Sequence, residues 1–92
     1  MKLPNKLKIG GHLYKVELVD SKSTDINGGN LCARLNRNKG TIFINKEMIQ
    51  SEQEVALFHE VFHVINNQFS EETTESLSQQ IYQVLKDNNL LN

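Results

Sequence analysis

The feature that most constrains this chain is the sequence His-Glu-x-x-His at residues 59–63. His59 and His63 are four residues apart, so on an α-helix they lie on one face, about 40° apart in projection. Two imidazole rings placed in this way can bind one metal ion. Glu60 lies directly beside them, within reach of a water molecule on that ion. We therefore expect a helix here that carries a metal site.

Zinc metallopeptidases use this pattern, with the two histidines as ligands and the glutamate as general base. From the histidine and glutamate frequencies of this chain, a chance match has a probability of about one in a hundred. The alternative is a pair of core histidines that bond to the backbone. That alternative is unfavourable, because two polar rings and an adjacent carboxylate are costly to bury without a charge partner.

The residues around the motif predict the limits of its helix. Ser51-Glu52-Gln53-Glu54 has the form of a capping box, with Ser51 as N-cap and Glu54 at the third helical position. The helix is therefore expected over about residues 52–66. On a helical wheel His59 and His63 share the one face that is not apolar. The apolar residues on the rest of the circumference are Leu57, Phe58, Val61, Phe62, Val64 and Ile65.

The rest of the chain predicts a single α+β domain. Alternating segments at residues 6–9 and 12–19, joined by Gly10-Gly11, indicate a β-hairpin. A second pair of strands is expected at residues 31–35 and 41–45, after a loop. Because hairpins join the strands and no crossover helix is visible, we predict a small antiparallel sheet of about four strands within residues 6–45. A second helix is expected over about residues 70–87, with Ser70 as its cap. Four strands followed by two helices is an α+β order.

A catalytic zinc ion needs three protein ligands and an open position for water. The chain has one cysteine, Cys32, and the only other histidine is His12. The natural source of the third ligand is the acidic cluster Glu71, Glu72 and Glu75 at the start of the second helix. Glu72 points away from the apolar stripe of that helix, whereas Glu71 and Glu75 flank it, and the wheel slightly favours Glu71. The predicted stripe consists of Leu77, Ile81, Val84 and Leu85.

The second half of the chain also resembles a known family. The similarity rests on the motif at residues 59–63, the preceding strand Thr41-Ile42-Phe43-Ile44-Asn45, and Glu75-Ser76-Leu77-Ser78 with the helix that follows. It covers residues 41–88. These segments resemble the gluzincins, and in particular compact phage- and prophage-type metallopeptidases related to the ImmA/IrrE group. The resemblance implies a zincin-like minimal core with one Zn²⁺ ion, held by His59, His63 and Glu75, with Glu71 as second choice.

The resemblance implies a zinc metalloendopeptidase of narrow specificity, with a regulatory role in a phage or prophage. Glu60 is expected to act as general base, and Tyr82 is a weak candidate for a donor that stabilises the transition state, with His12 weaker still. Residues 41–45 are expected to bind the substrate backbone by strand addition. The alternative is a metal-stabilised protein-binding module without turnover, and a metal-free interaction protein is the least favoured.

Composition narrows the expected partners. The net charge is −1, which gives no sign of nucleic-acid binding. The N-terminal residues lack the apolar run of a signal peptide, and no stretch approaches the length of a membrane span. A lone cysteine excludes an internal disulfide and fits a reducing compartment. We therefore expect a cytoplasmic protein whose partner is a peptide or protein substrate, with neither nucleic acid nor membrane involved.

Overall fold

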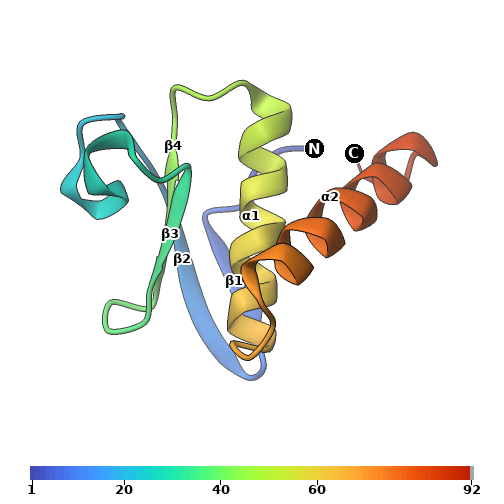
Figure 1. Cartoon of the computed structure of the whole chain (residues 1–92), viewed down its shortest axis with the longest axis horizontal. Coiled ribbons are helices and arrows are strands. Elements are labelled where there is room, and N and C mark those ends of the chain that lie inside the picture. Colours follow the sequence, from blue (N-terminus) through green and yellow to red (C-terminus); the bar gives the residue numbers. More distant parts are fainter. Residues whose placement is uncertain (92) are drawn as a thin grey trace.

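A four-stranded sheet lies on one side of helix α1, and helix α2 lies on the other (Figure 1). The computed structural model describes residues 1–91. Its elements are β1 Lys6–Ile9, β2 His12–Val19, the short 3₁₀ helix η1 Thr24–Gly29, β3 Ala33–Asn36, β4 Thr41–Asn45, α1 Gln50–Ile65 and α2 Glu71–Asp87. The predicted α+β class is confirmed. Within the described residues no helix has the length and apolarity to cross a membrane, and the cytoplasmic location stays a prediction.

The sheet is mixed, so the predicted all-antiparallel sheet is wrong. Its strand order is β1-β2-β4-β3. Both hairpins are antiparallel as expected, with Leu7 opposite Tyr14 in one and Leu35 opposite Ile42 in the other. However, β2 and β4 pair in parallel, with Val16 beside Ile42. A hairpin turn fixes the direction of its own two strands only, so the pairing between the hairpins carries no local signal in the sequence.

The segment between the hairpins explains the parallel pairing. After β2 this segment passes the position of β4 and leads to β3, which forms the outer edge of the sheet. The chain then turns back, and β4 pairs between β2 and β3. Ile26 of η1 is fully buried and anchors this crossing, which packs against β4 and β3. At Gly29 (φ +94°) a Cβ atom would lie 2.7 Å from the carbonyl oxygen of Ser21, so only glycine fits this turn.

The hydrophobic core lies between the sheet and α1. Its buried members are Val16, Ile42, Ile44 and Leu57. Each fully buried aliphatic side chain of this size contributes about 1.5–3 kcal/mol relative to exposure. The face of α1 that carries Leu57 therefore packs against the sheet. The face that carries His59 points toward α2 and the open edge of β3.

Helix α1 begins a half-turn earlier than predicted, and the capping box is not formed. Its N-cap is Ile49, which offers no side-chain hydrogen bond, and Ser51 lies inside the helix. The other half of the expected box, Glu54, is 1% exposed and accepts a hydrogen bond from Tyr82 of α2. Because the helix begins before Ser51, the two residues do not hold the positions that a capping box requires, and Glu54 bonds across to α2 instead.

Helix α2 begins as predicted but buries a different face. Ser70 caps it, because its Oγ accepts the backbone N–H of Thr73 at 3.1 Å. The residues that face α1 are Thr74, Ser78 and Tyr82. The apolar stripe predicted from hydropathy is only partly buried: Leu77 and Leu85 are half-buried, but Ile81 is 39% exposed and Val84 46%.

Candidate metal centre

The two motif histidines meet at their ring nitrogens. The Nε2 atoms of His59 and His63 lie 3.0 Å apart, and the ring planes meet at 67°. Both side chains are mostly buried, with 17% and 19% of their surface exposed. Four-residue spacing on a regular helix produces this approach, so the local sequence accounts for the pair.

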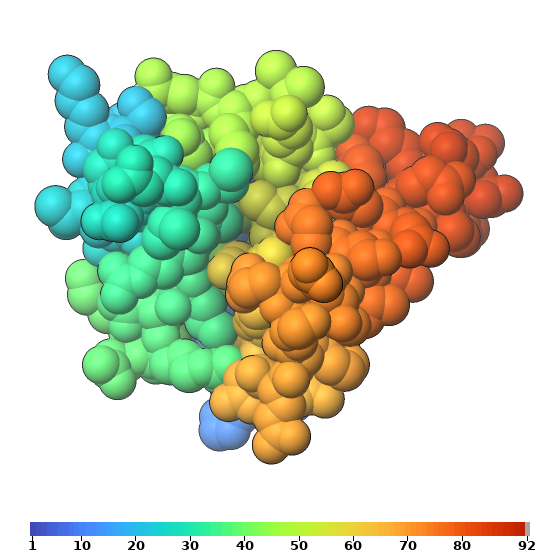
Figure 2. Space-filling view, viewed as in Figure 1, coloured from blue at the N-terminus to red at the C-terminus, as the bar shows by residue number. Residues whose placement is uncertain are grey.

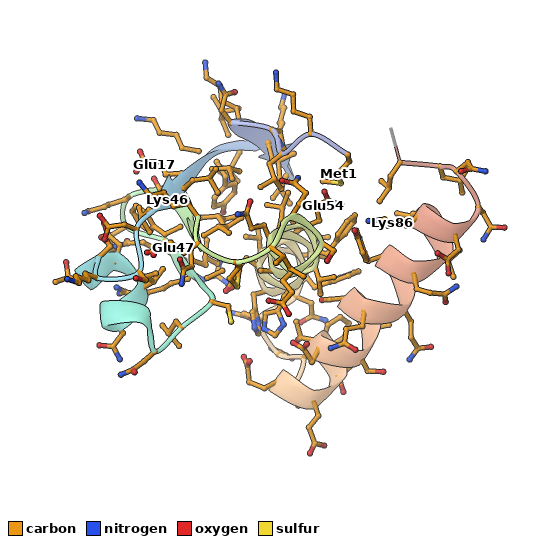
Figure 3. All side chains as sticks on the ribbon, turned by 90° about the horizontal axis from the view of Figure 1, so that it is seen from above. Met1, Glu17, Lys46, Glu47, Glu54 and Lys86 are labelled. Atoms are coloured by element: carbon orange, nitrogen blue, oxygen red, sulfur yellow. The ribbon has the colours of Figure 1, made fainter. Side chains whose placement is uncertain are left out.

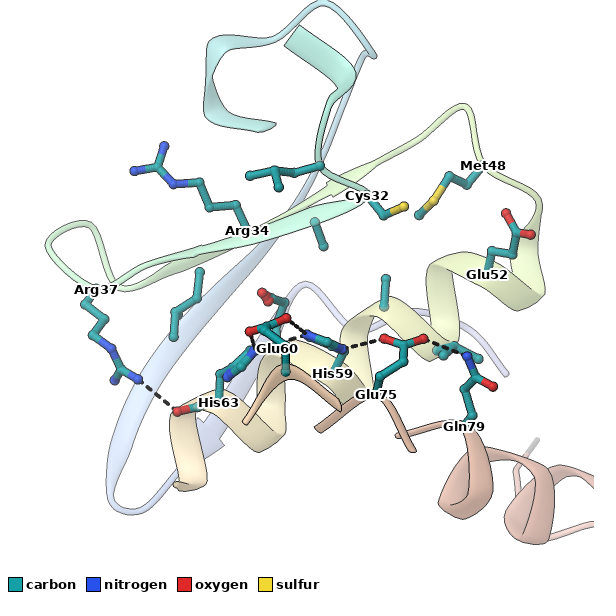
Figure 4. A pocket seen from close by; sticks show the side chains of 16 residues that line it. Cys32, Arg34, Arg37, Met48, Glu52, His59, Glu60, His63, Glu75 and Gln79 are labelled. Carbon is teal, nitrogen blue, oxygen red and sulfur yellow. Dashed lines mark hydrogen bonds and ion pairs between the residues drawn. The ribbon is translucent and has the colours of Figure 1, made fainter. Parts of the chain in front are cut away.

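Two glutamates of α2 reach His59 at different nitrogens of its ring. Figure 4 shows one of them, Glu75, beside His59. The Glu71 carboxylate lies against both Nε2 atoms, 2.8 Å from that of His63 and 3.2 Å from that of His59. Glu75 instead lies 2.8 Å from Nδ1 of His59, and its other oxygen accepts a hydrogen bond from Gln79 at 2.6 Å. Glu71 therefore occupies the point that the two histidines share, and Glu75 lies behind one of them.

Glu60 supplies a buried carboxylate beside the histidines. It is 7% exposed, and its Oε2 atom has no hydrogen-bond partner within residues 1–91. Burial raises the pKa of the Glu60 carboxyl above its usual value, opposed by the charges of His59 and His63 and reinforced by Glu71. A buried oxygen without a partner costs about 1–3 kcal/mol. The chain therefore retains a buried carboxylate oxygen next to the two histidines without satisfying it.

These residues fit a divalent metal such as zinc. One potential ligand atom from each of His59, Glu60 and His63 lies within 4.8 Å of the others. The carboxylate of Glu71 also lies at both histidine Nε2 atoms, and two imidazole nitrogens with one carboxylate form a donor set that zinc commonly takes in catalytic sites. The contact of Glu75 with Nδ1 of His59 is the kind of outer hydrogen bond that fixes the tautomer and orientation of a ligating histidine.

A cleft of about 960 Å³ opens over this centre, between β3, α1 and the first turns of α2. Figure 2 shows it as the hollow between the green β3–β4 hairpin and the orange α2, with α1 at its floor. Its lining combines the metal centre with apolar and basic groups: Leu31, Cys32, Ala33, Arg34, Leu35, Arg37, Met48, Glu52, Val55, Ala56, His59, Glu60, His63, Glu71, Glu75 and Gln79.

The edge strand along this cleft is β3, so the prediction that β4 binds a substrate strand is wrong. β4 is paired on both sides, by β2 and by β3. The N–H of Asn45 donates to the carbonyl of Cys32 at 2.9 Å, which makes residues 32 and 45 a hydrogen-bonded pair. Because such pairs alternate, the N–H and C=O groups of Ala33 and Leu35 point away from β4, toward the open edge.

The structure places Tyr82 and His12 away from the centre. The hydroxyl of Tyr82 donates to Glu54 at 2.7 Å and accepts from Lys86 at 2.9 Å. His12 is exposed at the start of β2, opposite Ile9 in the hairpin. Neither lines the cleft, so neither carries the transition-state role considered for it.

Arg37 is a residue of the site that the sequence did not indicate. Its Nη2 donates to the backbone carbonyl of His63 at 2.8 Å, and the residue lines the cleft. This bond ties the β3–β4 turn to the end of α1 that holds the second histidine. The two partners are 26 positions apart, so no local pattern could have predicted it.

Comparison of the chain with protein-family models, with curated protein sequences and with solved structures found no match in any of the three. The resemblance to the gluzincins and the ImmA/IrrE group therefore stays a prediction, and the functional argument rests on the geometry of the centre itself.

Proposed function

We propose that this protein is a zinc-dependent metallopeptidase that cleaves an extended peptide segment bound along β3. One observation carries the proposal: the Nε2 atoms of His59 and His63 and the carboxylate of Glu71 converge on one point. The unpartnered Oε2 of Glu60 lies buried in the same cleft. The implied phage or prophage role and narrow specificity stay predictions.

We assign different roles to the two glutamates of α2 because they contact different nitrogens. Glu71 is the proposed third ligand, because it alone contacts both Nε2 atoms. Glu75 is the proposed hydrogen-bond acceptor for the Nδ1–H of His59, which presents Nε2 to the metal. This proposal differs from the family resemblance, which implies Glu75 as the third ligand and Glu71 as the second choice.

In the proposed hydrolysis, different residues of the cleft transfer the proton and bind the substrate. A bound zinc ion would supply Lewis acidity, which polarises a carbonyl group and lowers the pKa of water. Glu60 takes a proton from the attacking water and passes it to the leaving amine. Glu60 is the residue after His59 and lines the cleft beside the two histidines, which is where a general base for a metal-bound water has to lie. The edge groups of Ala33 and Leu35 bind the substrate backbone as an added strand.

A metal-stabilised binding module is the second candidate, and Glu60 separates it from the enzyme. A structural metal site fills its coordination with protein ligands and has no use for a buried carboxylate oxygen without a partner. In this cleft such an oxygen is retained at a cost in stability.

Peptide cleavage by zinc-loaded protein tests the proposal. Wild type and Glu60→Gln are incubated with a mixed peptide library, and new termini are identified by mass spectrometry. We expect cleavage by the wild type only, with equal zinc content in both proteins. No cleavage by zinc-loaded wild type would favour the binding module, and equal cleavage by Glu60→Gln would refute the general-base role.

A further inference from the structure

A second polar cluster joins α1 and α2 beyond the cleft, around the buried carboxylate of Glu54. Its Oε1 accepts the hydroxyl of Tyr82 at 2.7 Å, and that hydroxyl accepts from Lys86 at 2.9 Å. Its Oε2 accepts from Gln50 at 2.7 Å and lies 3.6 Å from the nitrogen of Met1. Figure 3 shows Met1, Glu54 and Lys86 close together at one end of the helix pair. The cluster lies outside the cleft.

This cluster and the metal centre hold α2 on α1 at two separate points. Along α1, Glu54 precedes His59 by five residues, or about 7.5 Å. Along α2, Tyr82 follows Glu75 by seven residues, or about 10 Å. One attachment is the contact of Glu71 and Glu75 with the histidines. The other is the hydrogen bond from Tyr82 to Glu54.

The surface between these two points offers no directional contact. Thr74 and Ser78 are fully buried there, and the Ser78 hydroxyl donates to the carbonyl of Thr74 within the same helix. The Thr74 Oγ1 is buried without a hydrogen-bond partner in the described part of the chain. The ring of Tyr82 packs beside Phe58, with centroids 6.0 Å apart. None of these contacts is a hydrogen bond between the two helices.

Rotation of α2 matters because its glutamates must meet fixed nitrogens. Side chains reach about 5–6 Å from a helix axis, so a 20° rotation moves a carboxylate by about 2 Å. That displacement equals a whole zinc–oxygen bond of about 2.0–2.2 Å. The hydrogen bond from Tyr82 to Glu54 is the directional contact that opposes it at the far end of the helix.

We propose that Tyr82 and Glu54 are positioning residues for the metal centre. Their hydrogen bond sets the rotation of α2 on α1, which holds Glu71 at the two Nε2 atoms and Glu75 at Nδ1 of His59. This inference rests on the proposed metal site. It assigns Tyr82 a role at the centre that it exerts through Glu54 and helix α2, without contact with a substrate.

The test compares zinc affinity in Tyr82→Phe with that in a control of similar destabilisation. Tyr82→Phe keeps the ring against Phe58 and removes only the hydroxyl. Ile26→Val trims a fully buried side chain of η1, on the opposite side of the sheet from α2. Zinc affinity is measured by competition with a chromophoric chelator, and urea unfolding of the metal-free proteins checks that both variants fold. We expect about tenfold or greater weakening in Tyr82→Phe, the range seen for outer-shell contacts, and no change in Ile26→Val.

Two further variants separate positioning from simple packing. Glu54→Gln keeps an acceptor for the Tyr82 hydroxyl and should retain most of the zinc affinity. Glu54→Leu removes the acceptor and should behave like Tyr82→Phe. Equal zinc affinity in Tyr82→Phe, Ile26→Val and wild type would overturn the inference.

A second readout needs no metal. The ring ¹⁵N shifts of His59 in the metal-free protein report its contacts with Glu71 and Glu75. Tyr82→Phe should change these shifts and Ile26→Val should leave them as in wild type. Unchanged shifts in Tyr82→Phe would refute positioning. Failure of wild type to bind zinc, with the shift change still present, would instead refute the proposed function alone.

Discussion

The Nε2 atoms of His59 and His63 lie 3.0 Å apart. Two nitrogens that bind one zinc ion at 2.0–2.1 Å in tetrahedral geometry stand about 3.3 Å apart. The rings are thus already close to the separation that a shared ion requires. Little reorganisation of α1 is needed, and the remaining requirement is a third ligand from α2.

Replacing Glu60 with glutamine should abolish hydrolysis and leave zinc binding intact. Loss of a positioned general base lowers the rate by about 10²- to 10⁴-fold. The same change removes the charge of a buried carboxyl whose pKa is raised by burial, so the free energy of unfolding of the metal-free protein at neutral pH should rise. Urea denaturation and steady-state kinetics measure the two effects. A less stable Glu60→Gln protein would show that the carboxylate contributes to the fold.

Blocking the edge of β3 should weaken substrate binding. Ala33→Pro removes one outward N–H from the strand, a change that edge strands tolerate. Loss of one such hydrogen bond should lower kcat/KM for a cleaved peptide by about tenfold, mainly through KM. Lys8→Pro is the matched control, because it removes an outward N–H from β1, the other edge. Equal effects of the two variants would argue against strand addition at β3.

Acid should destabilise the metal-free protein partly through Glu54. Burial raises the pKa of its carboxyl, but the hydrogen bonds from Tyr82 and Gln50 and nearby positive charges outweigh burial and hold the pKa below its usual value. Between the folded and unfolded pKa values the unfolded chain binds more protons than the folded chain. The free energy of unfolding therefore decreases as the pH is lowered through that window. The contribution is present above the ordinary pKa of 4.5 and is lost as pH falls through the lower folded value.

Unfolding free energies of wild type and Glu54→Gln, measured from pH 6.5 to pH 3 by urea denaturation, test this dependence. The difference between the two proteins should shrink as the solution is acidified. A difference that stays constant over this range would show that the pKa of Glu54 is the same in the folded and unfolded chains.

Local signals in the sequence predicted much of the fold. Gly10 and Gly11 form the first hairpin turn with φ values of 59° and 88°, as expected for residues that must supply positive φ. Ser70 caps α2 through the backbone N–H of Thr73. The proximity of His59 and His63 follows from helical spacing alone. Each of these features depends on residues within four positions of one another.

The features that the sequence did not predict depend on distant partners. Parallel pairing of Val16 with Ile42 reflects the path of the crossing segment, which no turn motif encodes. Glu54 lies inside α1 and not at its predicted capping position, and it bonds to Tyr82, 28 positions away. The buried face of α2 was predicted from hydropathy alone, and this method does not detect that the small polar residues Thr74 and Ser78 are the buried ones. The roles of Glu71 and Glu75 depend on that same rotation.

The zinc content of four purified proteins tests the central claim most directly: wild type, His63→Ala, Glu71→Ala and Glu75→Ala, each loaded with zinc and freed of excess. We expect about one zinc per wild-type chain, loss of zinc in His63→Ala and Glu71→Ala, and binding weakened by about 10- to 100-fold in Glu75→Ala. Loss in Glu75→Ala with retention in Glu71→Ala would exchange the roles of the two glutamates. Absence of zinc from wild type after loading would contradict the metal centre itself.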